Sequence, residues 1–215
     1  MAEISVRKRI LSANDEVAEE NRARLAELGI LAVNIMASPG AGKTSVILAT
    51  AKRLPANARP GVIEGDLASS IDTEKMLAAG IPATQINTGG NCHLDAPMIR
   101  AALPALPLEQ IDILFIENVG NLVCPAEFDL GAARAVVIAS VPEGHDKPYK
   151  YPGMFAAADA IVLNKSDLAT YFEFDLEYFR RGVAMVNADA QVFVVSCRTG
   201  EGVDEWVAWL LCARE

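Results

Sequence analysis

The strongest constraint on the fold is a glycine-rich segment, residues 37–44, with the sequence ASPGAGKT. It follows the apolar run 31–37 and opens a stretch of helical character, 43–54. It matches the P-loop pattern G-x-x-x-x-G-K-S/T at every fixed position except the first, where alanine replaces glycine. In such a loop, backbone N–H groups and the helix N-terminus surround phosphate oxygens. The segment therefore predicts a strand, a phosphate-binding loop and a helix, in that order.

The side chains of this loop have separate expected roles. Lys43 would neutralise the β- and γ-phosphates, and the Thr44 hydroxyl would bind Mg²⁺. Gly40 and Gly42 would let the backbone turn so that its N–H groups face the phosphates. We expect the phosphate site to comprise Ser38, Gly40, Ala41, Gly42, Lys43, Thr44 and Ser45.

Apolar runs rich in Val and Ile alternate with helical segments along the rest of the chain. We expect strands at 31–37, 61–64, 84–87, 111–117, 135–140, 160–164 and 191–196, and helices at 43–54, 71–79, 95–103, 175–187 and 202–213. Parallel strands need crossover connections, so this alternation favours parallel pairing. The expected fold class is α/β: a P-loop NTPase with a mostly parallel sheet of about seven strands and helices on both faces. Ligands of such sheets bind at the carboxyl ends of the strands.

The first 30 residues predict a helix packed on a nucleotide-binding domain formed by residues 31–215. Ser12 or Asn14 could cap this helix, and Gly29 could end it. A chain of 215 residues lies within the size of one α/β domain, and no linker-like segment divides it. A single domain is therefore expected.

Composition excludes several classes of function. The net charge is −9, the wrong sign for a general nucleic-acid or membrane-surface binder. We find no run of 18 apolar residues, and the charged N-terminal segment lacks the apolar core of a signal peptide. Without an export signal, the four cysteines are expected to be reduced thiols of a cytoplasmic protein. From the charge and the absence of long apolar segments, we expect no nucleic-acid or membrane partner.

The sequence Asn164-Lys165-Ser166-Asp167 ends one expected strand and resembles the N-K-x-D guanine motif of GTPases. The Asp167 carboxylate would accept two hydrogen bonds from guanine, and adenine lacks that pair of donors. Lys165 would lie along the base, and Asn164 would tie this loop to the P-loop. Ser196, Cys197 and Arg198 follow the last strand and resemble the S-A-K loop that meets the guanine oxygen. The predicted cofactor is GTP or GDP rather than ATP.

Two further strand ends carry acidic residues that could serve Mg²⁺. Asp66 follows the second strand, and Asp72 is either a second magnesium candidate or a helix N-terminal residue. Glu117 and Gly120 lie in ENVG, which resembles the D-x-x-G motif with Glu for Asp. Asn121 stands where a Ras-like protein has its water-orienting glutamine. We therefore expect slow, Mg²⁺-dependent GTP hydrolysis to GDP and phosphate, with Lys43, Thr44, Asp66 and Glu117 as the catalytic set.

Cys92, His93 and Cys124 follow two expected strands at the same edge of the sheet. Thiolate plus imidazole suits Zn²⁺ or Ni²⁺, and water or a second subunit would supply a fourth ligand. The alternative is that both cysteines are small buried residues. Cys212 reads as packing in the last helix, and His145 reads as a solvated loop residue rather than a ligand.

The motifs together, SPGAGKT, EGD, NTGGNCHLDA, ENVGNLVCP, EGHDKPYKYP and NKSDL, resemble the HypB family over about residues 5–213. These are GTPases of nickel insertion in NiFe-hydrogenase maturation. The resemblance implies a nucleotide-coupled Ni²⁺ or Zn²⁺ site on Cys92, His93 and Cys124. It also implies a GTP-dependent homodimer, a HypA-type nickel chaperone as partner and, indirectly, the hydrogenase large subunit. Residues 1–30 contain no Cys or His, so we expect no separate nickel store.

Three alternatives remain open from the sequence. A urease-accessory GTPase of the UreG type carries Cys-Pro-His, whereas Ala126 follows Cys124-Pro125 here. A regulatory GTPase without metal would use Cys92 and Cys124 as core residues. An ATP-dependent kinase or partitioning ATPase conflicts with the NKSD motif.

Overall fold

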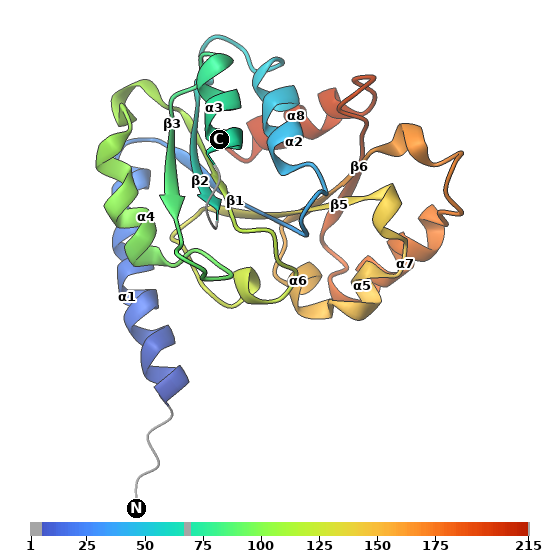
Figure 1. The fold of residues 1–215 in the computed structure, drawn as a ribbon, viewed down its shortest axis with the longest axis horizontal. Helices are drawn as coiled ribbons and strands as arrows, with labels where there is room; N and C mark the ends of the chain where they lie inside the picture. Colours follow the sequence, from blue (N-terminus) through green and yellow to red (C-terminus); the bar gives the residue numbers. More distant parts are fainter. Residues whose placement is uncertain (1–5, 67–69, 215) are drawn as a thin grey trace, which may run out of the picture.

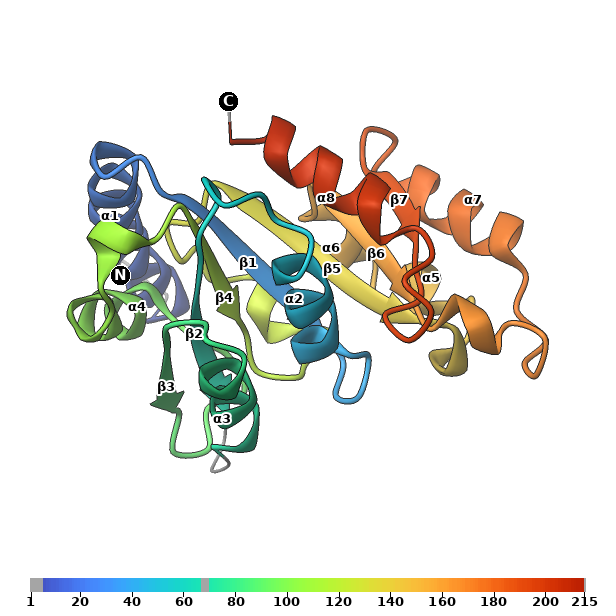
Figure 2. The same cartoon turned by 90° about the horizontal axis from the view of Figure 1, so that it is seen from above.

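The computed structural model describes residues 6–66 and 70–214, so the first five residues of the predicted N-terminal unit lie outside the described part. Seven strands form one sheet in the order β3-β2-β4-β1-β5-β6-β7 (Figures 1 and 2). Their bounds are β1 Leu31–Ala37, β2 Pro60–Asp66, β3 Ala83–Asn87, β4 Ile113–Glu117, β5 Arg134–Ser140, β6 Ala160–Asn164 and β7 Gln191–Val194. Every adjacent pair is parallel, which confirms the predicted α/β class.

Helices cover both faces of this sheet because its strands are apolar on both faces. All seven residues of β1 are buried. Val33 and Ile35 face α2 (Lys43–Ala51), α3 (Ile71–Ala78) and α8 (Val203–Cys212). On the opposite face, Ala32 packs toward α4 (Ala96–Ala102), and Met36 packs toward α6 (Pro152–Ala156) and α7 (Leu176–Val186). The short α5 spans Lys147–Lys150. The seven carboxyl ends therefore share one edge, where the predicted motifs lie.

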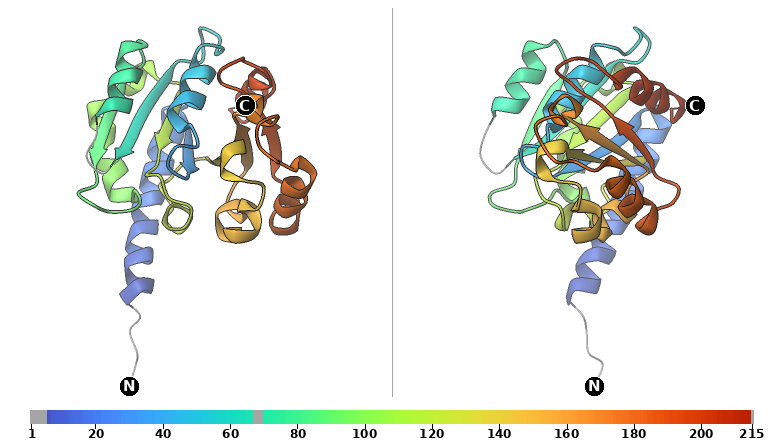
Figure 3. Two further views of the ribbon diagram at one scale, coloured as in Figure 1. Left: turned by 45° about the vertical axis from the view of Figure 1, so that its right-hand side comes forward. Right: turned by 90° about the vertical axis from the view of Figure 1, so that its right-hand side faces the viewer.

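The N-terminal helix differs from its prediction. α1 runs from Val6 to Glu27 beside α4, and its first turns extend past the edge of the sheet (Figures 1 and 3). Ser12 and Asn14 therefore lie inside the helix and do not cap it. Asn14 is buried and bonds to two other segments, so its tertiary partners override its cap preference.

Several element ends also differ from prediction by a few residues. β4 begins at Ile113, and the side chain of Asp112 just before it pairs with Arg59. β7 ends at Val194, and α2 ends at Ala51. Across residues 6–66 and 70–214, we find no helix with the length and apolarity needed to span a bilayer.

Candidate functional site

The P-loop is held in shape by the predicted base-binding loop. Gly40 and Gly42 have φ angles of +79° and +102°, which favour glycine. A Cβ on Gly42 would lie 2.5 Å from the Asn164 amide nitrogen, so no side chain fits there. That amide donates to the Ala41 carbonyl over 3.1 Å, and Lys165 Nζ donates to the Gly40 carbonyl over 2.7 Å. Side chains at the end of β6 and just after it thus hold the phosphate loop that follows β1.

A cavity of about 660 Å³ lies between α2 and the loops after β6 and β7. Asp167 lines it, accepts a hydrogen bond from the Ser196 hydroxyl over 2.7 Å, and lies 3.6 Å from Arg198 Nε. The Arg198 side chain is 81% exposed, so a base can displace it from Asp167 at little cost. Burial raises the pKa of the Cys197 thiol to about 11, so this cysteine stays protonated.

Lys165 is the one described residue other than glycine with a positive φ, at 62°. Its backbone N–H donates to Asn164 Oδ1 over 2.8 Å, and the same oxygen accepts from Cys197 N over 3.3 Å. Such conformations persist where neighbours over-determine them, often at ligand sites. The turn after β6 is therefore fixed before any base binds.

A second cluster lies behind the P-loop at the predicted magnesium position. Thr44 Oγ1 donates to Glu117 Oε1 over 3.0 Å. Glu117 Oε2 is buried and has no hydrogen-bond partner among the residues the structure describes. Burial raises the pKa of the Glu117 carboxyl to about 7, and the nearby Lys43 charge opposes that rise. An unsatisfied buried carboxylate oxygen beside a threonine hydroxyl fits a divalent cation. Asp66 ends β2, the strand paired with β4.

Glu64 is a buried acid that the sequence motifs missed. It lies opposite Glu117 in the parallel pairing of β2 with β4, and only 2% of it is exposed. Its Oε2 accepts from the Thr73 hydroxyl over 2.9 Å, and burial raises its carboxyl pKa to about 7. The sequence signal that could have revealed it is a glutamate inside the apolar strand VIEGD. A buried acid is costly without a partner, so such a residue is a candidate for a functional site. Two buried acids on adjacent strands therefore lie side by side at the expected magnesium position.

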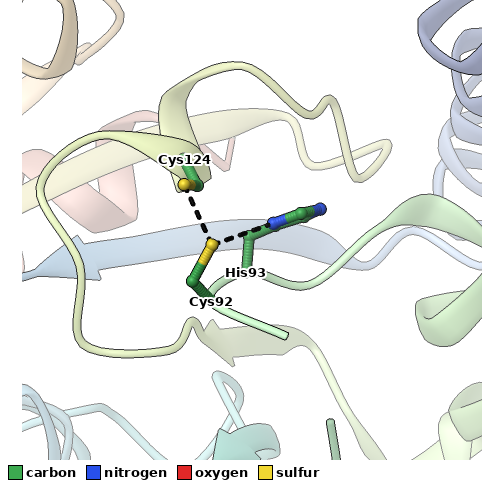
Figure 4. Close-up of side chains that lie close together, drawn as sticks. All are labelled: Cys92, His93 and Cys124. Carbon is green, nitrogen blue, oxygen red and sulfur yellow. Dashed lines mark hydrogen bonds between the residues drawn. The ribbon is translucent and has the colours of Figure 1, made fainter. Parts of the chain in front are cut away.

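The three predicted soft ligands lie together. Cys92 and His93 come from the loop after β3, and Cys124 begins a short 3₁₀ turn after β4 (Figure 4). Cys92 Sγ lies 3.0 Å from Cys124 Sγ and 3.7 Å from His93 Nδ1, and the ligand atoms all lie within 4.8 Å of one another. The hydrogen bond to Cys92 raises the pKa of the Cys124 thiol. His93 stacks on Phe128 at 3.8 Å between ring centroids, which holds its ring toward the sulfurs.

The segment between β4 and Cys124 contacts both clusters. Asn118 Oδ1 accepts from Leu94 N over 3.1 Å, and Asn121 Nδ2 donates to the Cys92 carbonyl over 3.2 Å. Asn121 N also donates to the P-loop carbonyl of Ala37 over 2.8 Å. A Cβ on Gly120 would meet Pro39 at 3.0 Å. A displacement of this segment at the P-loop would therefore reach the cysteines.

The structure also places three residues of secondary interest. The expectation that Cys212 packs in α8 is wrong, because this thiol is exposed at the helix end. His145 is not a free solvated side chain, since its ring packs against Phe174 and Tyr178 and its Nδ1 accepts from Asp175 N. Asp72 lies in the first turn of α3 and pairs with Lys75 over 2.7 Å.

Comparison with known proteins gives consistent findings. Residues 31–194 match the family described as CobW/HypB/UreG, nucleotide-binding domain. The chain is 49% identical over 201 residues to the hydrogenase maturation factor HypB of Escherichia coli K12, covering 94% of this chain and 69% of that protein. It is 41% identical to the probable HypB of Methanocaldococcus jannaschii, covering 94% and 91%.

Solved structures agree with these sequence matches. HypB from Helicobacter pylori in complex with nickel superposes with a TM-score of 0.90 at 38% identity, covering 94% of this chain and 95% of that one. HypB from Archaeoglobus fulgidus gives 0.89 at 41% identity, covering 95% and 100%. A more distant LAO/AO transport system kinase, at 16% identity and a TM-score of 0.57, shares the fold alone.

Proposed function

Because the chain belongs to the HypB family of CobW/HypB/UreG nucleotide-binding proteins, we propose that it is a GTP-hydrolysing nickel metallochaperone of hydrogenase maturation. The observation that carries this function is the placement of Cys92, His93 and Cys124 on loops tied to the P-loop. A regulatory GTPase without metal would have no use for three converging soft ligands at that position. The UreG alternative lacks its histidine, since Ala126 follows Pro125.

Guanine binding would use the cavity beside Asp167. The carboxylate, now bonded to Ser196 and close to Arg198, would exchange the exposed arginine for the N1–H and amine of the base. Asn164 and Lys165 would hold the base-binding loop against the P-loop through their hydrogen bonds to Ala41 and Gly40. The backbone of residues 196–198 would contact the guanine oxygen. The phosphates would bind to the backbone of residues 38–45 and to Lys43.

Magnesium fits the cluster behind the P-loop, where it would neutralise charge on the β- and γ-phosphates. Thr44, Glu117 and Asp66 would hold it, and the unpartnered Glu117 Oε2 supports this assignment. Hydrolysis would be slow because Asn121 is already engaged. Its amide donates to the Cys92 carbonyl and its oxygen accepts from Val123 N over 2.8 Å, so it does not orient an attacking water.

Nucleotide state would control nickel, the cargo, through the segment that joins Gly120 to Cys124. The γ-phosphate would draw the Gly120 amide, and Asn121 would transmit that shift to the carbonyl of Cys92. Thermodynamic linkage makes this coupling reciprocal, so nickel would change GTP affinity by the same factor.

The metal ligands are exposed or half-buried, which leaves an open coordination position for a partner. A GTP-dependent homodimer would supply the fourth ligand from a second copy or from water. We further propose a HypA-type nickel chaperone and, indirectly, the hydrogenase large subunit as partners. The similar proteins named hydrogenase maturation factors support a place in that machinery.

The test measures Ni²⁺ and Zn²⁺ affinity and molecular mass with GDP and with a non-hydrolysable GTP analogue. We expect different affinities in the two states and a dimer with the GTP analogue. Cys92→Ala should abolish metal binding while GTP binding persists, and excess ATP should not displace GTP. Equal metal affinities with GDP and with the GTP analogue would contradict the proposed coupling between nucleotide and metal. Metal binding that survives Cys92→Ala would favour a GTPase without this site.

A further inference from the structure

The buried face of α1 contains two amides where apolar residues are usual. Asn14, Ala18, Asn21 and Leu25 form one stripe, and the two asparagines are only 4% and 2% exposed. Burying an amide without partners is costly, so such groups are almost always hydrogen-bonded. The partners of these two amides therefore indicate what α1 holds.

Both amides bridge the same two segments. Asn14 Oδ1 accepts from Ala96 N over 2.8 Å, and its Nδ2 donates to the Asp129 carbonyl over 2.8 Å. Asn21 Nδ2 donates to the Ala96 carbonyl over 3.0 Å and to the Leu130 carbonyl over 3.1 Å. Ala96 follows the Cys92-His93 loop, and residues 129–130 follow the Cys124 turn. Each asparagine thus joins the segment that follows Cys92 and His93 to the segment that follows Cys124.

The α1 backbone also packs closely against the chain that follows Cys124. A Cβ on Gly131 would lie 2.4 Å from the Ala18 carbonyl, so the chain after Cys124 lies directly against the α1 backbone. Arg22 donates to the Ala132 carbonyl over 3.2 Å and pairs with Asp129. Figures 1 and 3 show α1 lying along α4, the helix that Ala96 begins.

The sheet alone does not bring the two segments together. β2 lies between β3 and β4, so the loop that carries Cys92 must cross the end of β2 to meet Cys124. A metal site needs its sulfur and nitrogen atoms about 2.0–2.3 Å from one ion. Contacts that hold both segments in place therefore help to decide whether Cys92, His93 and Cys124 can reach one ion.

We propose that Asn14 and Asn21 are positioning residues for the metal centre, holding the Cys92-His93 loop and the Cys124 turn at ligating distance. This inference rests on the proposed metal site. The contacts of α1 set the distance between the Cys92 and Cys124 sulfurs whether or not a metal is bound.

The first test needs no metal. The Cys92–Cys124 pair is equilibrated with glutathione redox buffers, where each disulfide formed consumes one glutathione disulfide and releases two reduced glutathiones. Peptide mapping quantifies this pair apart from Cys197 and Cys212. Losing a buried hydrogen-bonded amide costs enough to lower the effective concentration of the two thiols about tenfold. We expect that fall in Asn14→Ala and in Asn21→Ala.

Controls separate positioning from folding. Glu16→Ala alters an exposed residue of the same helix and should leave thiol pairing unchanged. Should the alanine variants not fold, Asn14→Ser keeps a neutral polar group at this buried position without adding a charge, and thiol pairing should fall in that variant too. GDP affinity serves as the check on folding and should stay at the wild-type value in each variant.

The second test measures Ni²⁺ affinity of the same proteins, which should fall about tenfold in the two alanine variants. Wild-type protein that binds no nickel would overturn the proposed function. Nickel binding by the wild type, with thiol pairing in both folded asparagine variants within twofold of wild type, would overturn the positioning role alone.

Discussion

Asn118 offers the sharpest test of how the nucleotide and metal clusters communicate. It is fully buried at the end of β4, and its Oδ1 accepts from Leu94 N over 3.1 Å and from Val119 N over 2.9 Å. Its Nδ2 donates to Asn34 Oδ1 over 3.2 Å. The side chain thus joins the segment beyond Glu117 to the loop that carries Cys92 and His93.

Asn118→Ala would leave two buried backbone N–H groups, those of Leu94 and Val119, without their acceptor. Each such group costs about 1–3 kcal/mol, so we expect the free energy of unfolding to fall by about 2–6 kcal/mol. Asn118→Asp keeps both acceptor contacts but buries a carboxyl group next to Asn34 Oδ1, so its loss of stability should be smaller than that of Asn118→Ala only at acidic pH, where the carboxyl group is neutral and can donate. Urea unfolding without nucleotide or metal measures both variants.

The same variants test the coupling. We expect the ratio of Ni²⁺ affinities, with GDP and with a non-hydrolysable GTP analogue, to approach one in Asn118→Ala and to stay near wild type in Asn118→Asp. Equilibrium dialysis measures the ratio. An Asn118→Ala protein that is as stable as wild type, or that keeps the wild-type ratio, would refute the role drawn from these contacts.

Three further predictions address the separate sites. Asp167→Asn removes the charged acceptor of two hydrogen bonds to guanine, each worth about 1.5–3 kcal/mol, so GTP affinity should fall at least about 100-fold in a competition assay. GTP affinity within tenfold of wild type would contradict the guanine assignment. Cys124→Ala should abolish Ni²⁺ binding in calorimetric titration, whereas Cys212→Ala, which changes an exposed thiol, should not; equal losses would contradict a local site. Folding raises the Glu117 carboxyl pKa from 4.5 to about 7, so its stabilising effect is complete below pH 4.5 and is lost as pH rises through 7. Without nucleotide, Glu117→Gln should therefore flatten the decline in unfolding free energy between these pH values, and an unchanged slope would place the titration elsewhere.

Local sequence patterns were sufficient for the sheet and for the motif positions. The Val- and Ile-rich runs predicted all seven strands, and the P-loop predicted the turn from β1 into α2. Such features depend on side-chain periodicity and on glycine at fixed spacing, which a chain carries without its tertiary contacts. The placement of Cys92, His93 and Cys124 at one edge of the sheet was also predictable, because parallel strands end together there.

Other assignments depended on partners distant in the chain. Asn14 had the character of a helix cap, yet it bonds to Ala96 and Asp129, which are 82 and 115 residues away. Glu64 carried no motif, and only the pairing of β2 with β4 places it beside Glu117.

The sequence by itself determined the fold class, the phosphate loop and the edge at which the ligands gather, because these follow from local pattern and chain order. The tertiary structure alone decided which buried polar groups join those parts. Whether Asn14, Asn21 or Asn118 caps, packs or bridges depends on which donors and acceptors the crossovers bring within about 3 Å. Spacing along the chain does not contain that information.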